Sequence, residues 1–343
     1  MNACERPGAV DLAARALGGS VVAASDESFG AKERLLLAAD PAFIPGTFDL
    51  RGEVVDGWET RRHAGPAGDW AIVRLGTPGR VHEIDVDTRF FTGNHPSGCR
   101  VDGVVLPALA DPCHPDVAWF PLVNSTPLKS DSRNILPVDD PRRVTHVRLA
   151  LDSDGGVARL RVYGDVVVDP ADLADVTVEM SGVENGGIVV WSSDTFYSDA
   201  RSLIAPGRPL TMGDGWETRR RRDIGPVSHD AVIIALAAEA DLQRIEVDTT
   251  WFVFNASAQV RVLGTQDRPS DGTSWWTVPF EVPVLERTVL EPDARRQFRV
   301  DAHGITALRL QAYPDGGIAR LRALGRPTSS GLADLAARWE RAQ

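Results

Sequence analysis

The sequence predicts a mostly β protein made of two tandem antiparallel β-sandwich or jelly-roll domains that arose by internal duplication. Three observations favour this fold class. One heptapeptide occurs twice, other motifs recur at nearly the same offset, and short segments that alternate apolar and polar residues fill both halves. A chain of 343 residues is about two ordinary domains, and 43% hydrophobic residues is enough for two cores.

The duplication is seen most directly in DGWETRR, which runs from Asp56 to Arg62 and again from Asp214 to Arg220, an offset of 158 residues. Two later pairs are both offset by 161 residues: VDT at 86–88 and 247–249, and GGVARLRVYG at 155–164 with GGIARLRALG at 316–325. The second copy therefore holds three extra residues, which we place in a loop insertion within RRRDIGPVSHD. A period near 160 residues is too long for a solenoid unit and indicates a duplicated domain.

Alternating segments predict the strands. In HEIDVDT (82–88), Ile84, Val86 and Thr88 share one face, and three acids share the other: Glu83, Asp85 and Asp87. VARLRVY (157–163) alternates in the same way, with Arg159, Arg161 and Tyr163 on its polar face. No convincing amphipathic crossover helix follows these strands, so the pattern favours an antiparallel sandwich over a βαβ architecture.

Helical patterns are confined to the chain ends and to the link between the halves. DLAARAL (Asp11 to Leu17) and LADLAARWERA (Leu332 to Ala342) predict terminal helices, and DLADV (172–176) lies in the link. We therefore expect a first β-sandwich repeat with an N-terminal helix over residues 1–170. A linker is expected over 171–186, and a second repeat with a C-terminal helix over 187–343.

Composition excludes several classes of partner. The net charge is −11, with no basic stripe to neutralise a phosphate backbone, so nucleic acid is not expected as a partner. The sequence has no apolar span of 18 residues, and its first residues carry charges where a signal peptide needs an apolar run, so no membrane partner is expected. Cys4, Cys99 and Cys113 suit free thiols in a reducing compartment. The sequence therefore predicts a cytoplasmic protein.

The motifs together resemble one family. DGWETRRHAGPAGDWAIVRLG, VDTRFFTGN and GGVARLRVYG, with DGWETRR and GGIARLRALG again in the second half, resemble allantoicase (allantoate amidinohydrolase), and the resemblance covers nearly the whole chain. It implies two galactose-binding-like β-sandwich repeats. It also implies a hydrolase that acts on linear ureide C–N bonds and releases urea from allantoate to leave ureidoglycolate. We expect a small-molecule substrate and a homo-oligomer.

Allantoate is a small anion with one carboxylate and two ureido arms. Arginine suits the carboxylate, because its guanidinium bonds a carboxylate bidentately. The candidate substrate-binding residues come from both copies of the heptapeptide and from the TGN turn: Arg61, Arg62, Asn94, Glu217, Arg219 and Arg220.

The candidate catalytic residues are Glu59, His63 and Asp87. In an extended chain Glu59, Arg61 and His63 share one face, so the first heptapeptide can present an acid, a cation and an imidazole together. Carboxylates and imidazoles are the usual acid–base groups. For two of these residues a structural role is the alternative: an ion pair with Arg61 for Glu59, and a solvated strand face for Asp87.

The second copy departs from the first. VDTRFFTGN becomes VDTTWFVFN, which replaces the polar turn with Val253 and Phe254 although Asn255 remains. We therefore expect the first repeat to hold more of the site, and the roles of Asp248 and Asn255 stay open.

Metal dependence stays unknown from the sequence. His95, Cys99, Cys113 and His114 match no standard zinc spacing, and no HExxH occurs. The sequence requires no cofactor, although a divalent metal ion would assist hydrolysis of an unactivated ureide. The alternative to an enzyme is a non-catalytic tandem β-sandwich that binds carbohydrate or another ligand, for which Trp275 and Trp276 are the best feature.

Overall fold

The computed structural model describes residues 9–50, 52–63, 68–223, 225–269 and 274–343. The chain divides into two compact units, formed chiefly by Ala9–Val167 and Val168–Glu340. We call these units repeat one and repeat two. Each consists mainly of antiparallel strands, which confirms the predicted fold class. The predicted loop insertion includes residue 224, which lies outside the described residues.

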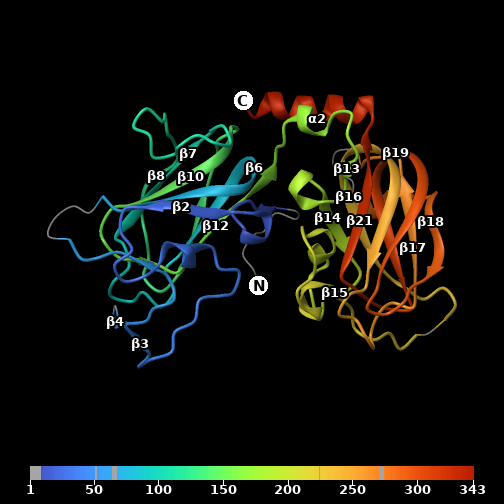
Figure 1. Ribbon diagram of the computed structural model, residues 1–343, viewed down its shortest axis with the longest axis horizontal. Helices are drawn as coiled ribbons and strands as arrows, with labels where there is room; N and C mark the ends of the chain where they lie inside the picture. Colours follow the sequence, from blue (N-terminus) through green and yellow to red (C-terminus); the bar gives the residue numbers. More distant parts are fainter. Residues whose placement is uncertain (1–8, 51, 64–67, 224, 270–273) are drawn as a thin grey trace. The chain divides into compact units, whose positions relative to one another are not determined.

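The main sheet of repeat one runs in the order β1-β12-β6-β10-β7-β8, and β2 and β9 also pair with β6. The strands of repeat one are drawn from blue to green in Figure 1 and have these bounds: β1 Val10–Asp11, β2 Ser20–Ala24, β3 Phe48–Asp49, β4 Gly52–Glu53, β5 Trp58–Glu59, β6 Trp70–Asp87, β7 Gly98–Val104, β8 Phe120–Pro127, β9 Arg133–Pro137, β10 Arg143–Leu151, β11 Gly156–Val157 and β12 Arg159–Val166. Strands β5 and β11 pair outside the main sheet, and so do β3 and β4. Two short 3-10 helices, η1 (Arg15–Leu17) and η2 (Lys32–Leu36), interrupt them.

Strand β6 organises repeat one because its two halves have different neighbours. Residues 70–74 pair with β10 and with β2, whereas residues 83–87 lie between β9 and β12. The long strand thus contributes to both layers of the sandwich. Its C-terminal half carries Asp85 and Asp87 between β9, which begins at Arg133, and β12, which carries Arg159 and Arg161.

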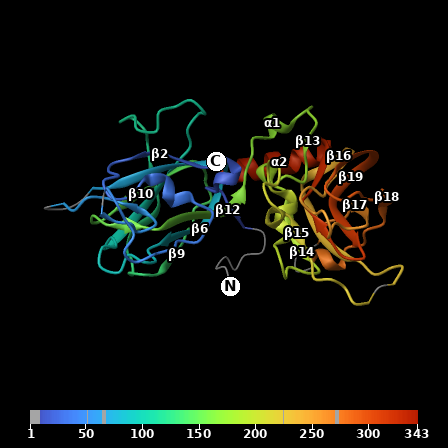
Figure 2. The same cartoon turned by 60° about the horizontal axis from the view of Figure 1, so that its bottom comes forward.

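Repeat two copies this plan, with the main sheet order β13-β21-β16-β19-β17-β18 and β14 on β16. These strands lie side by side in Figures 1 and 2. The strand bounds are β13 Val178–Glu179, β14 Ile188–Ser192, β15 Trp216–Glu217, β16 Asp230–Asp248, β17 Gln259–Thr265, β18 Val282–Val289, β19 Arg295–Tyr313, β20 Gly317–Ile318 and β21 Arg320–Pro327. The helices are α1 Pro170–Leu173, η3 Val183–Asn185, η4 Ala200–Ile204, η5 Met212–Asp214, η6 Trp275–Thr277 and α2 Ser329–Arg341.

Each repeat has its own apolar core, formed by the inward faces of the alternating strands. Trp58 and Phe91 are fully buried in repeat one, and Trp216 and Phe252 are fully buried in repeat two. The tryptophan of each heptapeptide is therefore a core residue. Its indole Nε1 still finds an acceptor, as a buried indole must: Trp58 donates to the carbonyl of Asp26 at 2.8 Å, and Trp216 to that of Asp194 at 2.9 Å.

The predicted N-terminal helix is wrong. Residues Val10–Asp11 form strand β1 on β12, and only the 3-10 turn η1 follows. The segment reads as helical because Leu12, Ala13 and Leu17 recur at helical spacing, but Leu12 and Ala13 are fully buried beside the sheet edge. Tertiary packing has overridden local propensity here.

The other helical predictions have short or shifted counterparts. DLADV contributes to α1, which is capped by the Asp169 side chain and ends at Leu173. LADLAARWERA lies within and just beyond α2. None of the helices in the described ranges is long and apolar enough to cross a membrane. Cys99 is buried and Cys113 is exposed, and both are free thiols, while Cys4 lies outside the described residues.

Candidate active site

The first heptapeptide is held against the end of the sandwich by a short pairing. Strand β5 pairs with β11, so that Glu59 lies opposite Gly156 and Trp58 opposite Val157. A side chain at Gly57 would come within 2.6 Å of the Val157 carbonyl oxygen. Only glycine allows so close an approach of the two backbones, and this fixes the position of the residues that follow.

Glu59 and Asn94 are brought together by this arrangement. Asn94 Nδ2 donates a hydrogen bond to Glu59 Oε1 at 2.6 Å, and the Asn94 carbonyl accepts from the Gly156 amide at 2.8 Å. Burial raises the pKa of the Glu59 carboxyl above its ordinary value, and the hydrogen bond from Asn94 offsets part of that rise. The pair therefore offers a half-buried acid in a fixed position.

A left-handed residue turns the chain between β6 and Asn94. Phe90 has φ of 70°, and its backbone amide donates to the Asp131 carboxylate at 2.8 Å. The next side chain, Phe91, fills the space that Gly57 and Gly156 leave open, because a Cβ at Gly156 would lie 1.8 Å from its ring. This packing sets the direction of the TGN turn.

The two arginines of the first heptapeptide differ in their contacts. Arg61 binds Asp26 twice, from its backbone amide at 2.8 Å and from Nε at 3.0 Å. Arg62 is exposed, and it makes no hydrogen bond or ion pair with the residues that the structure describes.

His63 contacts a different acid. Its Nε2 lies 3.0 Å from Oδ2 of the buried Asp69, whose other oxygen accepts from Ser25 Oγ at 2.8 Å. The predicted face of Glu59, Arg61 and His63 is thus divided among three separate partners: Asn94, Asp26 and Asp69.

Repeat two contains the same pair with another cation beside it. Asn255 Nδ2 donates to Glu217 Oε1 at 2.7 Å, and Arg219 Nε lies 2.9 Å from Asp194. Arg220, like Arg62, is exposed. At the position of His63, however, repeat two has Arg221, which binds Asp230 at 2.8 Å. The repeats therefore share the glutamate–asparagine pair but differ in the group that can transfer a proton.

Asp87 lies elsewhere, in what we call the charged pocket. Neither Asp87 nor Asp85 is solvated, since they are 2% and 2% exposed. Arg89 binds Asp87 through Nε at 2.9 Å and Nη2 at 2.7 Å, and Arg133 binds Asp85 through Nε at 2.7 Å. The alternative of a solvated strand face for Asp87 is therefore wrong, because Arg89 covers this acid.

The charged pocket has a volume of about 120 Å³. Its lining residues are Ala38, Asp40, Asp85, Asp87, Arg89, Arg133, Arg159, Arg161 and Tyr163. Apart from Asp87, none of these was among the predicted site residues. The signal that points to them is the register of β6 and β12, which sets Arg159 opposite Asp87 and Arg161 opposite Asp85.

The heptapeptide also reaches the wall of this pocket. Asp56 Oδ2 lies 2.6 Å from Nη2 of Arg159, whose side chain is nearly fully buried. Asp56 and Glu59 are three residues apart, so their Cα atoms lie within roughly 10 Å of one another. The charged pocket and the Glu59–Asn94 pair are thus neighbouring features of one end of repeat one.

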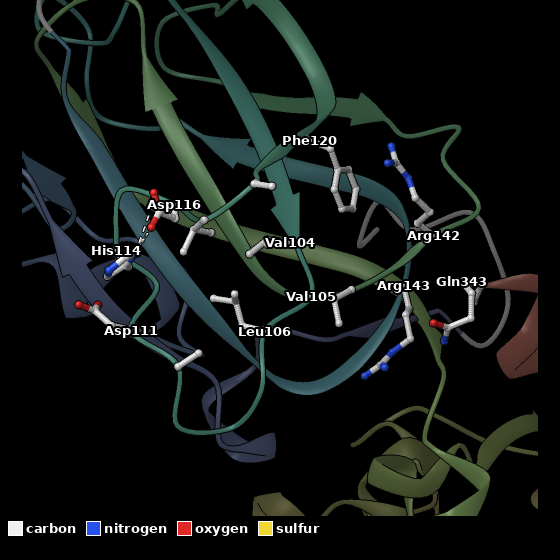
Figure 3. Close-up of a pocket in the computed structure, with 14 residues that line it drawn as sticks. Val104, Val105, Leu106, Asp111, His114, Asp116, Phe120, Arg142, Arg143 and Gln343 are labelled. Atoms are coloured by element: carbon white, nitrogen blue, oxygen red, sulfur yellow. Dashed lines mark hydrogen bonds and ion pairs between the residues drawn. The ribbon is translucent and has the colours of Figure 1, made fainter.

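A larger hollow in repeat one, about 550 Å³, has a different character. Figure 3 shows that Val104, Val105 and Leu106 line it, with Arg142 beside Phe120. The guanidinium carbon of Arg142 lies 3.7 Å from the centre of the Phe120 ring. None of the predicted site residues lines this hollow.

No group of three or more His, Cys, Asp or Glu side chains in the described ranges is arranged to hold a metal ion. The structure therefore adds no residue set to the open question of a divalent metal.

Fold and site define a duplicated β-sandwich protein with a small charged cavity and a repeated carboxylate–amide pair. The model of the allantoicase repeat matches residues 10–167 and 178–328. A Nocardia farcinica protein named "Probable allantoicase" is 45% identical over 322 residues, which are 92% of this chain and 93% of that protein. A Streptomyces avermitilis protein of the same name is 41% identical over 346 residues, with 96% and 89% covered.

The crystal structure of allantoicase from Saccharomyces cerevisiae is similar with a TM-score of 0.77 and 29% identity, and 92% of this chain and 93% of that chain are covered. The chain belongs to the allantoicase family, and it is a hydrolase.

Proposed function

We propose that the chain hydrolyses allantoate to ureidoglycolate and urea, a step of allantoin degradation in purine catabolism. The observation that carries the proposal is family membership across both repeats, with named relatives that match 92% and 96% of the chain. The comparisons do not favour the alternative of a non-catalytic carbohydrate-binding protein.

The substrate carboxylate would be bound by arginines of the first heptapeptide. Arg62 supports this role because its guanidinium is exposed, and Arg61 does so because Asp26 holds its orientation. Asn94 would position Glu59 and can also hydrogen bond a ureido group. Glu217, Arg219 and Arg220 of repeat two would contribute to binding more weakly, since the polar TGN turn is missing there.

The reaction requires a proton on the ureido nitrogen that leaves. In our proposal Glu59 donates it, while the lone pair of the other ureido nitrogen helps to break the C–N bond. Urea departs, and water adds to the resulting imine-like carbon and loses a proton. Glu59 is favoured as the acid because burial raises its pKa.

His63 and Asp87 are proposed for the remaining acid–base work. His63, held by Asp69, is suited to accept the proton of the attacking water. Asp87 is bound bidentately by Arg89, which suits a role in holding charge near the reacting carbon.

The test of the activity is urea release from purified protein supplied with allantoate, before and after treatment with a chelator. Urea formation establishes the reaction, and its loss on chelation with recovery on adding a divalent metal would assign a metal requirement. Absence of urea under both conditions, from folded protein, would refute the proposal.

The order of bond breaking can be tested in ¹⁸O-labelled water. We expect the label on the hydroxyl group of ureidoglycolate, because water traps the carbon after urea has left. The competing route is attack on a ureido carbonyl, which yields carbamate and an amine. Label in carbon dioxide, which forms when the carbamate decomposes, would establish that route instead.

We also propose that the protein acts in the cytoplasm as a homo-oligomer. The free thiols Cys99 and Cys113 support a reducing compartment. Sedimentation velocity of the purified chain would measure the oligomeric state, and a monomer at micromolar concentration would contradict the second part.

A further inference from the structure

The charged pocket runs from an exposed mouth to a buried floor. At the mouth the Asp40 side chain is 86% exposed and Arg89 is 31% exposed. At the floor the side chains of Asp87 and Asp85 are 3% and 2% exposed. Its volume of about 120 Å³ is roughly four times the volume that one water occupies in the liquid. This volume is enough for a small polar group, and both acids are among the lining residues.

Most of the polar atoms around the pocket already have partners. Arg159 donates to Asp56 and to the carbonyls of Ala39 and Ala158. Arg161 donates to the carbonyls of Leu35, Leu37 and Leu160. These two arginines form the wall and have little capacity left for a ligand.

Several polar groups at the pocket keep hydrogen-bonding capacity, and three of them are Asp85, Arg89 and Arg133. Oδ1 of Asp85 is buried and makes no hydrogen bond with the described residues, since Arg133 binds only Oδ2. Arg89 binds acids through Nε and Nη2, and Arg133 through the same two nitrogens, so each has an Nη1 without a partner in the described ranges. A buried carboxylate oxygen without a donor is costly, which indicates that a ligand supplies one.

The free acceptor of Asp85 and the free donors of Arg89 and Arg133 determine which kind of ligand fits. A simple anion would be repelled by Asp85, and a simple cation by the surrounding arginines. A group that is neutral and planar, with N–H donors on one side and a carbonyl acceptor on the other, satisfies both. A ureido group has that pattern, because its N–H hydrogens can reach a carboxylate while its oxygen accepts from guanidinium.

We propose that the charged pocket of repeat one binds a ureido group of the ureide, with Asp85 Oδ1 accepting from its N–H and Arg89 and Arg133 donating to its oxygen. The inference rests on the proposed function for the identity of the ureide. It adds a binding group, Asp85, that lies outside the heptapeptide but close to it, since Asp56 contacts the pocket wall.

Repeat two supplies the matched controls. The register of β16 and β21 makes Glu246 the counterpart of Asp85, and Thr250 stands where repeat one has Arg89. Gln297 Nε2 already donates to Glu246 Oε2 at 2.6 Å. Arg89→Thr therefore introduces a residue that this fold accepts at the matching place, and Glu246→Gln removes the matching acid without touching the charged pocket.

The experiment is calorimetric titration of the full chain with N-carbamoylglycine, a carboxylate with one ureido arm. We expect binding to the wild type, a loss of affinity of more than tenfold in Asp85→Asn and in Arg89→Thr, and a change of less than twofold in Glu246→Gln. Thermal melting checks that each variant is folded. If Asp85→Asn does not fold, Arg89→Thr still tests the proposal.

Two further ligands, urea and acetate, distinguish binding of the ureido group from binding of the carboxylate. Urea should compete with N-carbamoylglycine more strongly than acetate does at the same concentration. Equal competition by acetate, or unchanged affinity in folded Arg89→Thr, would overturn the ureido assignment. Binding needs no turnover, so binding without urea release from allantoate would refute the proposed function and leave the pocket assignment intact.

Discussion

Asn94 donates a hydrogen bond to Glu59 at 2.6 Å, and this contact joins the first heptapeptide to the turn that follows β6. The same contact in repeat two measures 2.7 Å between Asn255 and Glu217. Duplication has therefore preserved a carboxylate–amide pair rather than only a sequence motif. Since burial raises the Glu59 pKa and Asn94 lowers it, the pair also sets the pH range in which Glu59 holds a proton.

The first prediction concerns the pH dependence of catalysis. Asn94→Leu removes the hydrogen bond while keeping a side chain of similar size, so the Glu59 pKa should rise further. If Glu59 is the general acid, it stays protonated to higher pH, and the alkaline limb of kcat/KM should move to higher pH. Asn255→Leu is the control and should shift that limb less. An alkaline limb that stays in place in Asn94→Leu would remove Glu59 from the role of acid.

The second prediction concerns the substrate carboxylate. Arg62→Lys should lower kcat/KM by an amount equivalent to about 2 kcal/mol, because an ammonium cannot replace a bidentate guanidinium. Arg220→Lys is matched in sequence and exposure and should cost less than half as much. Arg61→Lys and Arg219→Lys are the second matched pair of variants, and the same asymmetry is expected for them. Steady-state kinetics on the four variants measures this, and equal losses in both repeats would contradict the expected asymmetry.

The third prediction concerns stability. Burial raises the pKa of Asp11 to about 6, although it accepts hydrogen bonds from the amides of Val162 and Ala13. The folded state therefore binds a proton more tightly than the unfolded state, and the stability from this group is lost as the pH rises through 6. Between pH 5 and pH 7.5 this loss should amount to about 1 kcal/mol.

Asp11→Asn keeps the acceptor oxygen and removes the titration. Its free energy of unfolding in urea should fall less between pH 5 and pH 7.5 than that of the wild type, by about 1 kcal/mol. An identical fall in the two proteins would show that Asp11 does not carry this pH dependence.

The repeats and the strand faces could be predicted because both depend on local sequence. DGWETRR recurs letter for letter, and Ile84 and Val86 are buried as their alternation predicts. Burial of Asp85 could not be predicted from its own strand, because an acid on the polar face of an alternating segment is normally solvated. Its partner Arg133 lies on β9, and that pairing depends on the fold.

The contacts of the first heptapeptide also could be predicted only in part. The residue type of Glu59 and its duplication indicate a candidate from the sequence alone. Which partner each charged residue takes was not predictable, since Asp26, Asp69 and Asn94 come from three different loops. The prediction of an N-terminal helix was wrong for a related reason. Pairing with β12 determines the structure of this segment more than its own residues do.

The left-handed turn after β6 has a counterpart after β16. Trp251 has φ of 74°, and its amide donates to Asp293 at 2.8 Å, as that of Phe90 does to Asp131. A bulky residue in this conformation costs on the order of 1–2 kcal/mol, and each copy bears that cost.

The two loops, RFFTGN and TWFVFN, share only a phenylalanine and an asparagine, so their side chains have drifted while the unfavourable backbone has not. The single-domain ancestor must already have had this turn. Selection after the duplication has preserved the backbone path that positions the asparagine, whereas most of the surrounding residues have changed.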